Sequence, residues 1–164
     1  MQRGVAMKNI TGKLFQNIQS REVSAFEYVN SNDYYSFVDS VQKQGYVQAI
    51  FTSDIMLKMI EYYLFTHNAQ IISIEFFVDD FVLQNEIDII LHKMSSNPAF
   101  WEMLKQKLIF LCEDHYIDIR KVDIKCSDDA YLLSIMVNGL FSVTSSAYPA
   151  VSAELCRLMG DYIK

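Results

Sequence analysis

Apolar residues along the chain recur mostly at intervals of three and four, the spacing of an amphipathic helix. The stripe that begins at Trp101 is the most regular. Asn97-Pro98 precedes it and combines an N-capping residue with a proline at the first helical position. This combination predicts a helix over about 98–116, and the same spacing predicts helices over 87–94 and 149–162.

Capping residues extend this prediction through the middle of the chain. Ser53 is a suitable N-cap for a helix that carries a leucine and isoleucine stripe, and Ile71–Phe81 carries the next stripe. Asp128-Asp129 provides acidic residues, which favour a helix N-terminus. They lead into Tyr131–Val143, which is apolar nearly all round and is therefore predicted as the most buried helix.

The N-terminal part of the chain predicts shorter helices. Ser24-x-x-Glu27 is a capping-box pattern, and Gly45 is a suitable helix stop. A longer helix is expected from about residue 46. The three short helices are predicted over about 7–18, 24–30 and 33–43.

Together these patterns predict an all-α fold of about nine helices, in which three short N-terminal helices precede a helical bundle. Residues 1–45 would form a small helical head. Residues 46–164 would form the helical bundle. One segment allows an alternative, because Ile117–Cys126 partly alternates between apolar and polar residues. With Ser127-Asp128-Asp129 as the turn and Tyr131–Val143 as the partner strand, a hairpin near 117–143 would give an α+β fold.

Composition places the chain among folded, acidic proteins. It has 164 residues, 51% of them hydrophobic, with five glycines, two prolines and a formal charge of −6. A chain of this size and apolar content can bury a sizeable core, whereas an acidic protein is repelled by nucleic acid unless its basic residues are grouped. Residues 1–21 contain four basic side chains and no acidic one. Any polyanion contact is therefore predicted for the N-terminal end, which contains Lys8, Lys13 and Arg21.

The sequence lacks the patterns of several catalytic classes, and we expect neither an enzyme, a cofactor nor a metal site. There is no phosphate-binding glycine loop and no Glu-x-x-His pair. Cys112-x-x-His115 provides only two zinc ligands on an apolar stripe, and the three cysteines are interpreted as core thiols of a reducing compartment. No apolar run spans a bilayer and no signal peptide is visible, so we predict a cytoplasmic protein without membrane contact.

Aromatic and acidic residues are concentrated in the middle of the chain. Glu75, Asp79 and Asp80, with His67 before them, would share one side of a helix. We interpret them as a solvated helix face, with acid/base chemistry as the alternative. The aromatic residues between 62 and 81 are interpreted as core, with a pocket for an apolar or cationic ligand as the alternative.

Three short stretches resemble the tetracycline-repressor (TetR) family of ligand-responsive transcriptional regulators. They are Leu14-Phe15, Tyr34-Tyr35-Ser36-Phe37 where the family has Tyr-x-His-Phe, and Asn138-Gly139-Leu140 in a segment similar to the family's penultimate helix. The chain departs from the family between Phe15 and Tyr34, where it is shorter and lacks the Ala-Gly-Val-Ser turn. Asp33 and Asp39 flank the expected recognition helix, so the resemblance implies a degenerate DNA-binding head. The DNA contacts that the resemblance implies are at Lys8, Lys13, Arg21 and Tyr35.

The resemblance implies a helix-turn-helix type for the head over residues 1–45, and ligand binding and dimerisation for the bundle over residues 46–164. It implies a homodimer built from helices near 128–145 and 149–163, and a ligand pocket within residues 54–116. The pocket residues it suggests are Tyr62, Glu75, Phe76 and Trp101. A second hypothesis follows from the charge and the missing catalytic patterns. It is a small acidic protein that binds a basic protein partner, of the immunity-protein or secretion-chaperone type.

Overall fold

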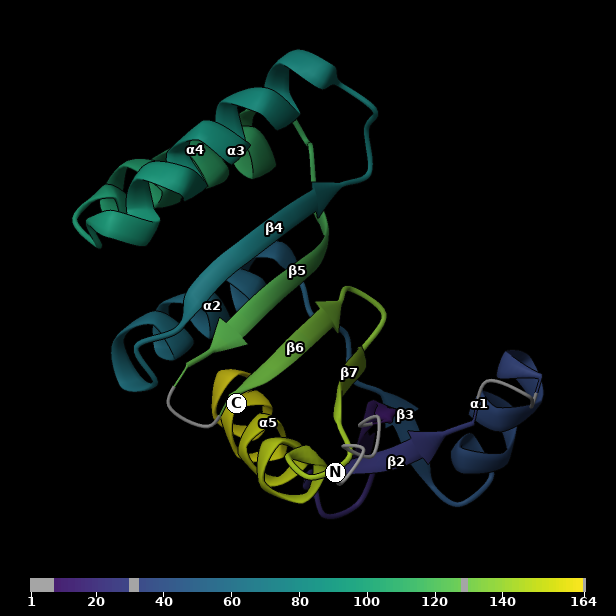
Figure 1. Cartoon of the computed structure of the whole chain (residues 1–164). Coiled ribbons are helices and arrows are strands. Elements are labelled where there is room, and N and C mark those ends of the chain that lie inside the picture. The colour runs from purple at the N-terminus through teal and green to yellow at the C-terminus, as the bar shows by residue number, and fades with distance from the viewer. Residues whose placement is uncertain (1–7, 30–32, 128–129, 164) are drawn as a thin grey trace, which may run out of the picture. The chain divides into compact units, whose positions relative to one another are not determined.

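The computed structural model describes residues 8–29, 33–127 and 130–163, and it shows an α+β protein (Figure 1). Five helices and seven strands lie in these ranges, so the prediction of an all-α fold with nine helices is wrong. The helices are α1 (Tyr34–Gln42), α2 (Ser53–Thr66), α3 (Phe81–Ser96), α4 (Phe100–Asp114) and α5 (Tyr148–Tyr162). The strands are β1 (Asn9–Asn17), β2 (Val23–Tyr28), β3 (Tyr46–Gln48), β4 (Gln70–Phe76), β5 (Ile119–Cys126), β6 (Tyr131–Met136) and β7 (Leu140–Thr144).

The chain divides into two compact units. Unit 1 consists of Met1–Ile50 and Asn138–Lys164, and unit 2 consists of Phe51–Val137. Unit 1 therefore contains β1, β2, α1, β3, β7 and α5, while unit 2 contains α2, β4, α3, α4, β5 and β6. Strands occur in both units, so neither the helical head over 1–45 nor the helical bundle over 46–164 is present.

In unit 1, the long strand β1 is central. It pairs antiparallel with β2 on one side and with β7 on the other, and its end also pairs with β3. The rings of Phe15 and Phe26 pack against Val38 and Val41 of α1, while Gly12 lies against Tyr148 of α5. Neighbouring residues of a strand point to opposite faces, so α1 and α5 cover opposite faces of this sheet.

In unit 2, β5 pairs antiparallel with β4 on one side and with β6 on the other. The side chains of Ile74 and Val122 are buried where α2 packs against β4 and β5. Helices α3 and α4 form an antiparallel pair, and α3 lies beside the outer strand β4. The side chain of Gln84 donates to the main-chain oxygen of Ile74 at 3.0 Å, so α3 protects the outer edge of that strand.

Helices with local signals were predicted in the right places. The helix expected over 98–116 is α4, and the one expected over 149–162 is α5, which has proline at its start. The helix capped near Ser53 is α2, although Thr52 is the residue whose side chain accepts from Ile55. The segments predicted over 33–43 and 87–94 correspond to α1 and to the second half of α3.

The other predicted helices are strands. In their described parts, the range 7–18 contains β1 and the range 24–30 contains most of β2. Residue 46 begins β3, residues 71–76 belong to β4, and 131–143 contains β6 and most of β7. In β1, Leu14 and Phe15 are both fully buried because helices cover both faces of the sheet, and this removes the alternation that marks a strand. In β4, the register with β5 shifts between Ile71 and Ser73. This bulge gives the buried residues Ile71 and Ile74 a helix-like spacing of three.

For residues 117–143, the predicted hairpin agrees with the structure better than the predicted helix does. Strands β5 and β6 pair in register from Lys121–Met136 to Cys126–Tyr131. Of the predicted turn Ser127-Asp128-Asp129, both aspartates lie outside the described residues. The partner strand expected over Tyr131–Val143 is divided into β6 and β7 at Gly139, whose φ of +86° is left-handed. A Cβ on Gly139 would lie 2.2 Å from the main-chain oxygen of Ala49, so this position requires glycine.

Within the described ranges, none of the helices combines the length and the apolar character that crossing a bilayer would require.

Candidate functional site

The four residues suggested for a ligand pocket lie on three elements of unit 2. Tyr62 on α2 is half-buried, with its ring 5.5 Å from Tyr63 and 5.7 Å from His67. Phe76 at the end of β4 and Trp101 at the start of α4 are buried in the core. The indole Nε1 of Trp101 has no hydrogen-bond partner among the described residues. Glu75 lies on the polar face of the sheet.

Two cavities are lined by other residues. A groove of about 680 Å³ lies in unit 1, between the β1–β2 turn and the second half of α5. A smaller cavity of about 220 Å³ lies in unit 2, where Leu64, Leu91 and Met94 are among its lining residues. None of the four suggested pocket residues lines either of these two cavities, and the ligand pocket stays a prediction.

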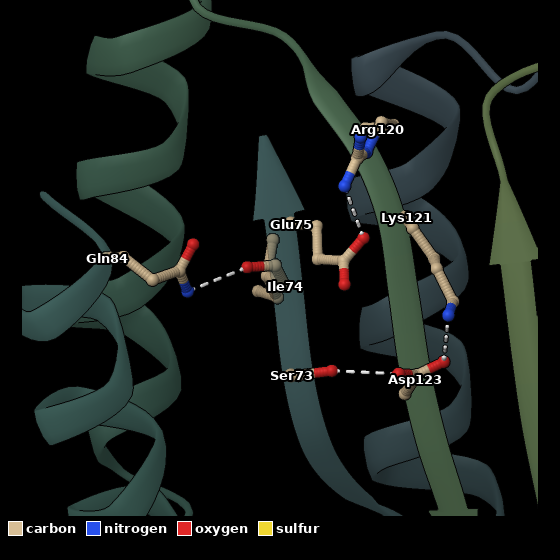
Figure 2. A network of polar contacts seen from close by, with 7 residues as sticks. All are labelled: Ser73, Ile74, Glu75, Gln84, Arg120, Lys121 and Asp123. Carbon is tan, nitrogen blue, oxygen red and sulfur yellow. Dashed lines mark hydrogen bonds and ion pairs between the residues drawn. The ribbon is translucent and has the colours of Figure 1, made fainter. Parts of the chain in front are cut away.

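Glu75 belongs to a polar network across β4 and β5 (Figure 2). Its carboxylate accepts from the guanidinium of Arg120 at 2.8 Å. Beside this pair, Asp123 accepts hydrogen bonds from the hydroxyls of Ser73, at 2.9 Å, and of Ser134. Lys121 lies 3.8 Å from the Asp123 carboxylate. Both carboxylates are paired or hydrogen-bonded, so the network has a structural role in linking neighbouring strands of unit 2.

The predicted carboxylate cluster is not on one side of a helix. Glu75 is in a strand, Asp79 is in the connection after it, and Asp80 is the N-cap of α3. The Asp80 carboxylate accepts from the main-chain N–H groups of Val82 and Leu83 at 3.0 and 3.1 Å. Asp80 therefore has a structural role, while Glu75 is bound to Arg120.

The residues predicted to contact DNA are dispersed over unit 1. Lys8 is exposed before β1, Arg21 is exposed in the β1–β2 turn, and Tyr35 is 80% exposed on α1. Lys13 is fully buried in β1, so its amine is not available to a phosphate in this structure. Only one helix, α1, lies in the described part of residues 1–45, so a helix-turn-helix pair is not formed there.

Lys13 is the one charged residue that is fully buried among the described residues. Its ammonium donates to the main-chain oxygen of Asn138, and it lies 5.7 Å from the ring centre of Phe15 and 5.5 Å from that of Tyr34. Burial lowers the pKa of Lys13 from 10.5 to about 8. The carbonyl and the two ring faces accommodate the charged form, which explains how an amine is tolerated in this core.

The cysteines do not form a reactive or metal-binding centre in the described ranges. Cys126 is fully buried, and burial raises the pKa of Cys112 and that of Cys156, the latter to about 11. Both thiols therefore stay protonated at neutral pH. His115 is exposed, with its ring 4.6 Å from Phe110. No cluster of three or more potential metal ligands occurs in the described residues.

The most exposed apolar side chains of unit 2 are concentrated at one end of the α3–α4 pair. Phe81 is 93% exposed and Tyr116 is 86% exposed, the highest values among the exposed large apolar residues of the described chain. They are accompanied by five exposed acids. We define the acidic aromatic surface as Phe77, Val78, Asp79, Asp80, Phe81, Val82, Glu113, Asp114, Tyr116 and Asp118.

Chain topology brings these residues together. Because α3 and α4 are antiparallel, the start of α3 and the end of α4 lie at the same end of the pair, and an ion pair of 2.7 Å between Glu86 and Lys107 sets their register. The end of β4 joins them, since the N–H of Phe77 donates to the main-chain oxygen of Asp118 at 3.2 Å. Two segments that are distant in sequence, 77–82 and 113–118, thus contribute to one surface.

The negative charge of this surface is not compensated by neighbouring bases. Unit 2 contains fourteen acidic and seven basic residues. Its described ion pairs join five of those bases to other acids, namely Asp54, Glu61, Glu75, Glu86 and Asp123. Glu113 and Asp114 lie in the last turn of α4, where the helix dipole disfavours negative charge and no basic residue is present.

Sequence reasoning did not identify this surface. It treated Val78 and Phe81 as the core stripe of a helix, whereas the structure exposes both. The local signal was present in the sequence, because Asp80 followed by an apolar run is a helix N-cap pattern that separates β4 from α3.

Compared with protein-family models, curated proteins and solved structures, the chain shows no significant match to any of them.

Proposed function

We propose that this chain is a non-enzymatic protein-binding protein, and that it binds a basic protein partner through the acidic aromatic surface. The observation that carries the proposal is the coincidence of uncovered aromatic anchors with uncompensated acids at one end of unit 2. Exposed apolar groups of this extent favour association, and aromatic residues are the commonest anchors of protein interfaces.

The charge selects the class of partner. The acids around Phe81 would attract a surface rich in lysine and arginine and would speed its association through long-range steering. The same acids disfavour nucleic acid and anionic membranes. Glu113 and Asp114 reduce the stability of α4, which is the pattern expected where charge serves binding rather than folding.

This proposal takes up the second of the two hypotheses drawn from the sequence. The regulator hypothesis rested on a nine-helix layout, and an α+β fold does not suit it. Asn138-Gly139-Leu140, which resembled part of a helix, lies at the turn before β7. Of the two helices expected at a dimer interface, the one near 128–145 is a pair of strands in its described part, and dimerisation itself stays a prediction.

Site-specific photocrosslinking in the native host cell would test the proposal. A photoreactive phenylalanine analogue is placed at position 81. The matched control carries the same analogue at Phe65, which is 63% exposed near the C-terminal end of α2. The hydroxyl of Ser53 at the start of α2 donates to Asp118, so Phe65 lies about 18 Å along the helix from the surface.

We expect position 81 to capture one basic protein that position 65 does not capture. The purified pair should bind more weakly as salt rises, and Phe81→Ala should weaken it at least about tenfold. Capture of the same proteins from both positions, or a captured partner with an acidic surface, would contradict the proposal.

A further inference from the structure

The outer edge of β2 has unused hydrogen-bonding groups. The N–H of Asn17 donates to the oxygen of Glu22 at 2.8 Å, which makes these residues a hydrogen-bonded pair at the turn of the β1–β2 hairpin. Because hydrogen-bonded and non-hydrogen-bonded pairs alternate, the backbone groups of Val23, Ala25 and Glu27 point away from β1. No described residue pairs with these outward groups.

Leu14 supports this assignment from the other side of β1. Its N–H donates to Gly139 and its oxygen accepts from Ala49, so Leu14 bonds away from β2. Leu14 is the register partner of Ala25. Two opposite residues of an antiparallel pair exchange either both of their backbone hydrogen bonds or neither, so Ala25 does not hydrogen-bond to β1 either.

The β2 edge also lacks the features that usually prevent strand addition. It has no proline, no lysine, no arginine and no bulge, and Glu27 is its single charged residue. Helices α1 and α5 cover the two faces of the sheet, which leaves the edge itself uncovered in the described structure.

A groove begins at the end of this edge. Its volume is about 680 Å³, within the range of ligand-binding pockets. Val23, Cys156 and Ile163 contribute its apolar lining, and burial keeps the Cys156 thiol neutral by raising its pKa. The charged lining residues are balanced, two basic and two acidic: Arg21, Arg157, Glu22 and Asp161.

We propose that an extended peptide segment of a partner protein adds to β2 as a further strand and places an uncharged aliphatic side chain in the groove. The unpaired N–H and C=O groups on alternate residues of β2 match those of an extended peptide backbone. In such strand addition, the main-chain hydrogen bonds provide affinity and a pocket beside the edge, here the groove, selects a side chain of the peptide. The balanced charges of the groove favour an uncharged residue there.

A second copy of this chain fits less well. If β2 paired with itself about a two-fold axis, the side chains it would present on the α5 face are Val23, Ala25 and Glu27. Glu27 would approach Glu22 and Asp161, which is electrostatically unfavourable.

Selection from a library of random linear nonapeptides would test the inference with the full-length chain. Two variants report on the two parts of the site. Gly160 lines the groove and a Cβ added to it would meet no atom within 4 Å, so Gly160→Leu is chosen to place a side chain in the groove, and Ala153→Leu on the exposed side of α5 is its control. Ala25→Pro removes one outward N–H while leaving the bonds to β1.

We expect selected peptides to share an aliphatic residue and to shift the amide resonances of Val23, Ala25 and Glu27. Gly160→Leu and Ala25→Pro should each weaken binding at least about tenfold, with folding retained, whereas Ala153→Leu should not. Peptides that are insensitive to both variants, or failure to select any peptide, would overturn the inference. Concentration-dependent dimerisation that protects the same amides would overturn it in favour of a second copy. This test is independent of the acidic aromatic surface, which belongs to the other unit.

Discussion

The Lys13 ammonium donates a hydrogen bond to the main-chain oxygen of Asn138 in a part of unit 1 where no surface of the lysine remains accessible to solvent. The interaction joins the central strand β1 to the turn that precedes β7. It places a cation where sequence reasoning expected a solvent-facing contact with DNA, and it makes the stability of the fold dependent on pH in a defined direction.

Stability should rise with pH through the range in which Lys13 titrates. Burial lowers the pKa of Lys13 from 10.5 to about 8, so the unfolded chain binds more protons than the folded chain between these values. The stability of the wild type relative to Lys13→Met should therefore be constant below about pH 7. It should increase by at most about 1.4 kcal/mol per pH unit above pH 8. Urea unfolding of both proteins from pH 6 to 10.5 measures this difference, and a flat difference would show that the amine is solvated.

Gly139→Ala should destabilise the fold more than Gly45→Ala. Both glycines have a left-handed φ, so alanine costs about 1–2 kcal/mol in each. At Gly139 the added Cβ would also lie 2.2 Å from the main-chain oxygen of Ala49, whereas at Gly45 it would meet no atom within 4 Å. We expect unfolding midpoints in urea to show the larger loss for Gly139→Ala, and equal losses would contradict the close approach of the two segments.

Neutralising an acid at either end of α4 should have opposite effects. Glu113 lies in the last turn and Glu102 in the first. Glu113→Gln should therefore stabilise the chain by about 0.3–1 kcal/mol, while Glu102→Gln should destabilise it by a similar amount. Thermal unfolding at low ionic strength measures both, and the difference should shrink in salt. If the proposed function is correct, Glu113→Gln should also weaken binding of the basic partner.

The two carboxylates of Figure 2 should differ in their contribution to stability. Asp123→Ala removes the acceptor for two hydroxyls, on Ser73 and Ser134, in a partly buried position and should cost about 1–3 kcal/mol. Glu75→Ala breaks a half-exposed ion pair with Arg120 and should cost at most about 1 kcal/mol. A loss for Glu75→Ala as large as that for Asp123→Ala would contradict this ranking.

Parts of this architecture were predictable from the sequence because their signals are local. The start of α5 is marked by Pro149, and α4 shows the regular apolar spacing from Trp101 to Leu111. Cys126 was interpreted as a core residue and is fully buried. The backbone hydrogen bonds and the buried apolar stripe of such a helix are formed by residues within about fifteen positions of one another, so a short stretch of sequence is enough to predict the helix.

The strands were misassigned for particular reasons. In β6, Tyr131, Leu133 and Ile135 alternate as buried residues, but the outward positions include the apolar residues Leu132 and Met136, so the segment looked apolar all round. In β4, a bulge replaced the period of two. In β2, Ser24-x-x-Glu27 imitated a capping box, although Ser24 is the register partner of Phe15 in the hairpin.

By itself, the sequence determined the helices whose caps and stripes are local, the apolar content sufficient for a core, and the acidic balance of the chain. The tertiary structure alone decided which strands pair, why Lys13 is inside, and which aromatic residues are left outside. The physical reason is that a strand obtains its hydrogen bonds and its covering layers from residues distant in sequence. The acidic aromatic surface has the same origin, since the antiparallel packing of α3 and α4 brings the start of α3, with Phe81, and the end of α4, which Tyr116 follows, to the same end of the pair.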